Sequence, residues 1–377
     1  MRHLALLVAI AGIVAACSAD DSTPWVWNLP AGFPSPVVPA DNPLTQEKAE
    51  LGRHLFYDVR LSGNETQSCA SCHQQALAFS EDRRTAVGST GEAHRRNSMT
   101  LVNVAYNSTY TWAHSGIDTL ERQILIPLFG ERPIELGATD NEQEILARLR
   151  DDATYTALFR AAFPRDDAPI DFDNIVKALA GFVRTLTSFD SPFDRYAYYG
   201  EDSALSESQI RGMNLFMSER LECSHCHAGF NFSQFVAHEN LNPQERPFHV
   251  TGLYNFGESG AVDLDRGLYD VTGDPADLDR FKAPTLRNVA HSAPYMHDGS
   301  LETLREVIAF YAGGGREIRQ GELRGDGRLH PGKSAFVIGF ELSADEERDL
   351  LSFLDSLTDT AFLENPAFGN PWNGVNP

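Results

Sequence analysis

Two short motifs constrain this chain more than any other feature. Residues 69–73 read CASCH and residues 223–227 read CSHCH, so both fit C-x-x-C-H, the pattern that attaches c-type haem. Two thiols at this spacing add to the vinyl groups of one porphyrin, and the next histidine supplies the proximal ligand of the iron. A zinc site or a dithiol redox pair is the alternative, although the motifs use every cysteine except Cys17. We therefore predict two covalent haems, held by Cys69, Cys72 and His73 and by Cys223, Cys226 and His227.

The first residues read as an export signal. A basic start and an apolar run over residues 4–14 suit a secretory leader and are too short to span a bilayer. The small residues before Cys17 are typical of a bacterial lipoprotein processing site, so we predict a signal peptide over residues 1–17 and acylation of Cys17. Cleavage after Ala19 is the alternative. The expected location is the periplasm, with the protein lipid-anchored rather than membrane-spanning.

The charge balance narrows the classes of partner. Asp and Glu number 53 against 31 Lys and Arg, which is a formal net charge of -22. Such a surface disfavours nucleic acid and anionic lipid, and it steers a basic protein towards the chain. The net charge therefore affects which partners approach the protein, and it does not identify the reaction.

A second repeat precedes each haem motif. Residues 52–56 and residues 212–216 both read G-x-x-L-F. Each predicts a short amphipathic helix, which begins after Thr45 in the first copy and after Ser206, part of a full capping box, in the second. This duplication indicates two related domains.

Helical periodicity predicts the fold class. Residues 142–162 and 174–188 have it, and no sustained alternation predicts a sheet. We predict a mainly α fold of two tandem cytochrome c-like domains with one covalent c-type haem each. Polar and proline-containing residues place the linker at about 190 to 204. The predicted parts after the leader are an extended arm over 18–43, an N-terminal domain over 44–195, a C-terminal domain over 204–360 and a tail over 361–377.

Further motifs resemble the bacterial di-haem cytochrome c peroxidase and MauG superfamily over nearly the whole mature chain. They are Trp112 followed by L-E-x-Q-x-x-x-P from residue 120, P-T-L-R-N-V at 284–289 and A-P-Y-M-H-D-G at 293–299. The resemblance implies that the first domain carries the peroxide-reacting haem.

Other segments are similar to the MbnH-type branch of this superfamily. They are W-N-L-P-x-G-F-P at 27–34, D-N-P at 41–43 and L-S-G-N at 61–64. Members of that branch are paired with a copper-binding MbnP-type protein in which a tryptophan is oxidised to kynurenine. The resemblance therefore implies a protein substrate.

The sixth ligand of the second haem separates the branches. A methionine fourteen residues after the histidine of P-Y-x-H-D-G fills it in many peroxidases of the family, and that position, counted from His297, is Tyr311, as in MauG-like enzymes. The pattern over residues 300–311 predicts a helix that turns Tyr311 inward. A core tyrosine is the alternative, and Met296 or His297 could compete for the iron. A phenolate favours more oxidised iron than a thioether does, so Tyr311 argues for storing oxidising equivalents.

The first haem departs from the family in a complementary way. A loop histidine of the family falls on Ser89, which implies a five-coordinate iron. His94 lies in the same loop and could reach inward, but its basic neighbours Arg95 and Arg96 favour a solvated position. Gln123 and Glu135 match the distal glutamine and glutamate of the family, and a carboxylate there moves the proton that peroxide cleavage requires. Two extra residues precede Glu135, so a surface position is its alternative.

Between the haems, the resemblance assigns an electron path and a cation. Trp112 matches the tryptophan that passes electron holes, with ordinary core packing as the alternative. Asn97, with the carbonyl groups of Ser292 and Pro294, matches the site of one calcium ion. Ser292 replaces a threonine, a change without consequence if only the carbonyl binds.

The resemblance implies a MauG/MbnH-like di-haem oxidase. It would use hydrogen peroxide to form a high-valent di-haem state and oxidise a tryptophan to kynurenine on a partner copper-binding protein. The alternative is a di-haem cytochrome c peroxidase that reduces hydrogen peroxide with electrons from a small cytochrome. A pure electron carrier needs two six-coordinate irons, which the missing loop histidine disfavours. The predicted catalytic residues are Gln123, Glu135, Trp112 and Tyr311. Three phenylalanines after the second motif, Phe230, Phe232 and Phe235, are expected to cover that haem's edge.

Overall fold

The computed structural model describes residues 22–241, 247–255 and 265–372. This part of the chain is mainly helical, as predicted, and its one regular sheet is the antiparallel pair β1 (Glu317–Ile318) and β2 (Gly325–Asp326). No helix there is long and apolar enough to cross a membrane. The predicted signal peptide and Cys17 lie outside the described residues.

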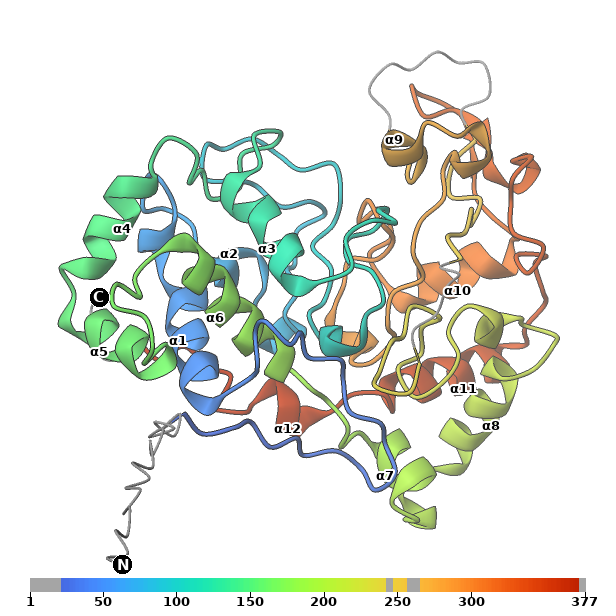
Figure 1. Cartoon of the computed structure of the whole chain (residues 1–377). Coiled ribbons are helices and arrows are strands. Elements are labelled where there is room, and N and C mark those ends of the chain that lie inside the picture. Colours follow the sequence, from blue (N-terminus) through green and yellow to red (C-terminus); the bar gives the residue numbers. More distant parts are fainter. Residues whose placement is uncertain (1–21, 242–246, 256–264, 373–377) are drawn as a thin grey trace, which may run out of the picture.

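The helices form two lobes (Figure 1). In the first lobe, α1 (Gln46–Tyr57) packs on α6 (Phe172–Thr185) and on α5 (Ala153–Ala162). The second face of α6 receives α3 (Leu120–Phe129), and α4 (Glu142–Arg150) packs on α5. Their apolar faces share one core, which includes Leu51, Leu55, Phe56, Ile145, Phe159, Ile175, Leu179 and Phe182.

The second lobe repeats this arrangement around a separate core. Helix α8 (Glu207–Phe216) packs on α11 (Ala344–Asp355), which also contacts α10 (Leu304–Ala312). The short helices are α7 (Pro192–Tyr198), α9 (Tyr269–Thr272) and α12 (Thr360–Leu363). Phe193 of α7 lies in the second core, although the sequence assigns residues up to 195 to the first domain. The core residues include Phe193, Phe216, Phe232, Leu350, Phe353 and Leu354.

The G-x-x-L-F repeat marks one helix crossing used twice. A Cβ on Gly52 would lie 2.0 Å from the Ala178 carbonyl oxygen, and one on Gly212 would lie 1.9 Å from that of Asp349. Only glycine therefore lets α1 approach α6, and α8 approach α11, so closely. Both predicted helix starts are confirmed, because α1 follows its N-cap Thr45 and α8 follows a Ser206 capping box.

Both ends of the described chain cross between the lobes. The N-terminal arm, dark blue in Figure 1, runs from the first lobe to α7, and the ring of Phe33 contacts those of Phe189 and Phe230. The C-terminal residues return to the first lobe, where Phe362 packs in the core and the Trp372 indole donates to the His54 carbonyl. These segments strap the two lobes together.

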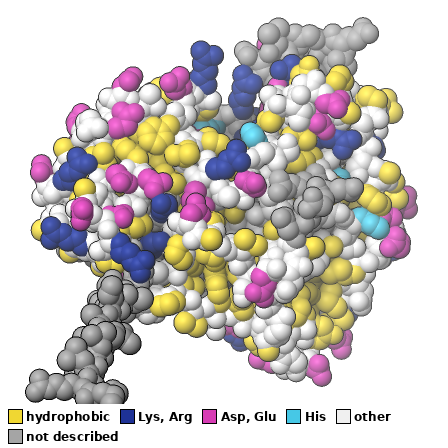
Figure 2. Space-filling view, viewed as in Figure 1, with side chains coloured by type: hydrophobic (Ala, Val, Ile, Leu, Met, Phe, Trp, Pro, Cys, Tyr) yellow, Lys and Arg dark blue, Asp and Glu magenta, His cyan; other side chains and the backbone are white. Residues whose placement is uncertain are grey.

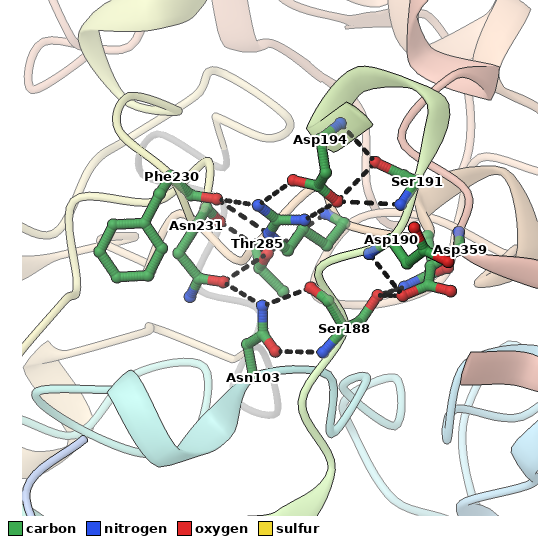
Figure 3. A network of polar contacts seen from close by, with 11 residues as sticks. Asn103, Ser188, Asp190, Ser191, Asp194, Phe230, Asn231, Thr285 and Asp359 are labelled. Atoms are coloured by element: carbon green, nitrogen blue, oxygen red, sulfur yellow. Dashed lines mark hydrogen bonds and ion pairs between the residues drawn. The ribbon is translucent and has the colours of Figure 1, made fainter. Parts of the chain in front are cut away.

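A buried polar network also joins the lobes (Figure 3). The Ser188 amide donates to Asn103 of the first lobe at 2.7 Å, and the Asn288 amide of the second lobe donates to the Ser188 hydroxyl at 2.9 Å. Nearby, the Arg287 guanidinium donates twice to the Asp194 carboxylate at 2.8 Å. Because both charges are buried and paired, removing either one leaves the other without a partner at a large cost in stability.

Candidate haem and peroxide sites

The first attachment motif forms a single helical turn, α2 (Cys69–Cys72). The amide of His73 donates to the Cys69 carbonyl at 3.0 Å, so the histidine directly follows the turn. Its Nδ1 lies 2.8 Å from the Phe79 carbonyl oxygen, which leaves Nε2 available as a metal ligand. Burial lowers the pKa of His73, and the neutral imidazole is the form that binds iron.

The second motif repeats the design on a 3₁₀ turn over Cys223–His225. The amide of His227 donates to the Cys223 carbonyl at 3.1 Å. Its Nδ1 lies 3.1 Å from the carbonyl oxygens of both Phe232 and Pro284. Burial lowers the pKa of His227 to about 4, so this imidazole is also neutral.

The carbonyls that hold the two histidines come from strained residues. Phe79 has a φ of 56° and Phe232 one of 47°, a left-handed backbone that costs energy for a bulky residue. Both phenylalanine side chains are fully buried, which holds that backbone in place. The strained backbone at these two phenylalanines thus orients His73 and His227.

The four described cysteines suit thioether attachment. All four are free of disulfides, and burial raises the pKa of Cys69, Cys72 and Cys223 to about 12 and that of Cys226 to about 11. Zinc binding and dithiol exchange need thiolates of low pKa. An uncharged thioether fits these surroundings better than either alternative does.

A cavity extends from the second motif to α10. His227 and both motif cysteines line it from one side, and Tyr311 lines it from α10. Burial, followed by the nearby Cys226 and Cys223, raises the pKa of Tyr311 well above its usual value. Within the described ranges no residue hydrogen bonds to its hydroxyl, and only a cation bound there would favour the phenolate. The donor set therefore fits a second axial ligand.

Met296 and His297 line the same cavity as Tyr311. The His297 ring is 8% exposed and stacks on Phe281 with 3.6 Å between ring centroids. The stacking occupies one face of that imidazole. The choice of Tyr311 as ligand stays a prediction, since all three side chains are in the cavity.

Trp112 lies where the two lobes meet. Its indole Nε1 donates to the Asn97 carbonyl at 2.8 Å, and its own carbonyl accepts from the Lys282 amide of the second lobe at 2.8 Å. The side chain lines the cavity of the second site. This position suits the predicted path between the haems.

The predicted calcium ligands line the same cavity as Trp112. Asn97, Ser292 and Pro294 all line the cavity. The Asn97 side-chain amide donates to the carbonyls of Arg83 and Arg84, which leaves its Oδ1 as a possible oxygen ligand. Neutral oxygens suit calcium when waters complete the shell, and the assignment stays a prediction.

The predicted distal residues of the first site come from two adjoining segments. Gln123 lies on α3, and its Oε1 is buried without a hydrogen bond in the described part of the chain. The Leu136 amide donates to the Pro127 carbonyl at 2.9 Å, which ties the segment of Glu135 to the end of the same helix. The two extra residues are accommodated in the turn between them, where Glu131 bridges Ile134.

Glu135 lies close to the first attachment motif. Its negative charge raises the pKa of both Cys69 and Cys72. Although 34% of its side chain is exposed, burial raises the pKa of Glu135 to about 7. Near neutral pH this carboxyl group is therefore ionised in only a fraction of the protein molecules. Such a group is suited to proton transfer.

The solvated position predicted for His94 is wrong. Its side chain is 17% exposed, and Nε2 lies 3.9 Å from Oε1 of Glu135. The amide of His94 donates to the Ala86 carbonyl at 2.8 Å, which folds the loop back and turns the imidazole inward. Arg96 points elsewhere, because its guanidinium pairs with Asp265 at 2.5 Å.

The predicted phenylalanine cover of the second haem is also wrong. Phe232 packs in the core of the second lobe, Phe235 packs on Phe248, and Phe230 contacts Phe33 of the arm. The three rings diverge because of the left-handed backbone at Phe232. The phenylalanines that line the cavity are Phe216, Phe281, Phe336 and Phe340.

Sequence reasoning missed one buried cation. Lys282 is 3% exposed and lines the cavity beside Trp112. Its Nζ donates to the Thr109 carbonyl at 2.9 Å, and burial lowers its pKa to about 7. A lysine directly before the A-P-T-L-R-N segment was the available signal.

Comparisons with known proteins agree with this geometry. Residues 46–203 match the di-haem cytochrome c peroxidase family. A solved MauG-like protein associated with microbial copper homeostasis is 47% identical, with a TM-score of 0.89 over 92% of this chain and 99% of that one. A cytochrome-c peroxidase of Pseudomonas sp. (strain SCT) is 34% identical over 94% of this chain and 92% of its own. The methylamine utilization protein MauG of Methylorubrum extorquens is 34% identical over 91% of this chain and 88% of its own.

Proposed function

The chain belongs to the di-haem cytochrome c peroxidase and MauG family of oxidoreductases, and from this premise we propose that it oxidises a tryptophan of a partner protein to kynurenine with hydrogen peroxide. The observation that carries the proposal is Tyr311, which lines the same cavity as His227. The partner would be a copper-binding protein of the MbnP type. Its choice is supported by the 47% identity to a MauG-like protein associated with copper homeostasis.

The residues of the first site handle peroxide. When bound, the haems supply the redox chemistry, with peroxide reacting at the first and oxidising equivalents held by both. The Glu135 carboxylate takes the first proton of peroxide at one of its oxygens and returns it to the departing oxygen. The unpaired Oε1 of Gln123 accepts a hydrogen bond from the bound peroxide.

The residues between the sites connect them. The Trp112 indole has a fixed orientation because Nε1 is bonded to the Asn97 carbonyl. That orientation favours passage of an electron hole through its ring system. Tyr311 would hold the second iron as its phenolate and would favour the oxidised states that a thioether would disfavour.

The alternative is a peroxidase that consumes hydrogen peroxide with electrons from a small cytochrome. It is favoured by the 34% identity to a cytochrome-c peroxidase and by the net charge of -22, which would attract a basic cytochrome. Acidic side chains are scattered over the visible face rather than gathered in one patch (Figure 2). Tyr311 speaks against this function, since a methionine ligand would raise the potential and ease reduction.

The deciding experiment adds hydrogen peroxide to the purified di-haem protein with the candidate partner. We expect mass spectrometry to find kynurenine in place of one partner tryptophan. The Tyr311→Phe enzyme with the same partner is the control. If the partner stays unmodified while a reduced small cytochrome supports rapid peroxide consumption, the alternative function replaces the proposal.

The leader supports a periplasmic location with a lipid anchor at Cys17. We expect Cys17→Ser to move the protein from the membrane fraction to the soluble fraction without changing peroxide turnover, because anchor and sites are separate segments. A native protein that is already fully soluble would contradict the anchor.

A further inference from the structure

The loop before the predicted calcium ligand folds into a tight antiparallel turn. The amide of His94 donates to the Ala86 carbonyl at 2.8 Å, and the amide of Gly88 donates to the Glu92 carbonyl at 2.9 Å. Val87 and Ala93 form the bridge between the two sides. Because the turn is closed by its own backbone, the direction of His94 is defined independently of any ligand.

This turn is locked to the segment that carries Glu135. The amide of Ser89 donates to the Glu135 carbonyl at 2.8 Å. A Cβ on Gly88 would lie 1.9 Å from the Ile134 carbonyl oxygen, so the contact requires glycine at that position. The far side of the turn is held by Asn64, whose side-chain amide donates to the Ser89 carbonyl at 2.7 Å. Two backbone segments are thus fixed at van der Waals distance.

The lock brings an imidazole and a carboxyl together. The 3.9 Å between Nε2 of His94 and Oε1 of Glu135 exceeds a hydrogen bond, but such contacts are often long before substrate binds and then tighten. Burial lowers the pKa of His94, against the opposing effect of Glu92, and burial raises that of Glu135. The imidazole is therefore neutral, and its N–H group can serve as a hydrogen-bond donor.

Few other charges face this pair. Glu92 is the one charged side chain in the described residues that shifts the pKa of His94, and its own side chain is exposed. Cys69 and Cys72 lie near Glu135, but as thioethers they carry no charge. The imidazole of His94 is thus the neighbouring group that can control the carboxyl.

We propose that His94 is a positioning residue of the peroxide site, which donates from Nε2–H to Oε1 of Glu135 and holds the carboxyl in its working orientation. The inference rests on the proposed proton transfer by Glu135. The backbone of Ser89 anchors the Glu135 segment, while the imidazole five residues later acts on the carboxyl group.

The test compares His94→Phe with His94→Gln in the purified di-haem protein, without any partner. A phenyl ring fills the space without a donor, whereas the glutamine amide restores one. For His94→Phe we expect the peroxide reaction to slow by about 10-fold to 100-fold, as misplacement of a catalytic group does. Its rate profile should also move to higher pH, because loss of a donor disfavours the carboxylate.

A second readout is the fluoride affinity of the ferric first haem across the same pH series, since fluoride binding is favoured when the distal carboxyl is protonated. The pH dependence of fluoride binding should shift together with the rate profile in His94→Phe. It should return to the native position in His94→Gln. Thr90→Ala, an exposed and uncharged change in the same turn, is the matched control and should leave both readouts unchanged.

Three results would overturn the proposal. One is an unchanged rate and profile in His94→Phe. The second is a His94→Gln enzyme as impaired as His94→Phe. The third is a native first haem that is low-spin and becomes high-spin in His94→Phe, because His94 would then bind the iron. If instead Glu135→Gln leaves the peroxide rate unchanged, the proposed role of Glu135 fails, whereas the proposal that a partner tryptophan is oxidised stands with either result.

Discussion

The two haem sites share their proximal halves and differ in what faces them. In both, a neutral histidine is held by the carbonyl of a left-handed phenylalanine, Phe79 or Phe232. The first site is faced by polar groups from the segments around α3, whereas the second is faced by Tyr311 on α10. The duplicated part of the fold thus supplies haem attachment, and the segments outside the repeat supply the division of labour.

The largest effect is expected from removing one proximal ligand at a time. His73→Gly should abolish the reaction with peroxide while the absorption and paramagnetic resonance signals of the second haem persist, because only the reactive iron loses its ligand. His227→Gly should instead remove the signals of the second haem and leave those of the first haem in place. Equal loss of both haem signatures in either variant would show that the two haems do not have separate roles.

Next in size is the change of the second haem's sixth ligand. Tyr311→Met should raise the reduction potential of that haem and end partner oxidation, because a thioether replaces a phenolate. Tyr311→Phe should end partner oxidation by vacating the position. The matched control is Tyr295→Phe, since Tyr295 lines the same cavity but donates to the Val289 carbonyl. An unchanged low-spin signal and partner reaction in Tyr311→Phe would place the ligand elsewhere.

The distal carboxyl of the first site should show a partial, pH-dependent effect. Glu135→Gln should slow the peroxide reaction by about 100-fold or more, the usual contribution of a general base. Because burial raises the pKa of Glu135 to about 7, the native rate should rise as pH increases through that value and the carboxylate forms. Stopped-flow rates over a pH series give the profile, which should be flat in Glu135→Gln. A native profile without a step near that pH would argue against a proton acceptor at this position.

The smallest effect is expected at the close helix crossing that both lobes contain. Gly52→Ala and Gly212→Ala should each lower the free energy of unfolding by about 1–3 kcal/mol through overpacking, each in its own lobe. Denaturant unfolding followed at the two haem absorption signals would measure it. Gly181→Ala is the control, because the nearest atom to its Cβ is at 3.5 Å. If both variants shifted the two haem signals together, the lobes would unfold as one unit.

Local chemistry explains what could be predicted from the sequence. The attachment motifs, the N-caps Thr45 and Ser206 and the helices of residues 142–162 depend on neighbours within a few positions, and so does the inward face of the helix that ends near Tyr311. The same holds for the repeat at Gly52 and Gly212, although its reason, a close helix crossing, is visible only in three dimensions.

The site as a whole depends on contacts between distant segments. The sequence by itself determined the helical class and the family, and the motifs named the candidate attachment points and ligands. Only the tertiary structure decided that His94 meets Glu135 and that three neighbouring phenylalanines point to different cores. Side-chain direction there follows from left-handed residues and from backbone locks such as Gly88 on Ile134. Such contacts join residues far apart in the chain, so local sequence propensity does not predict them.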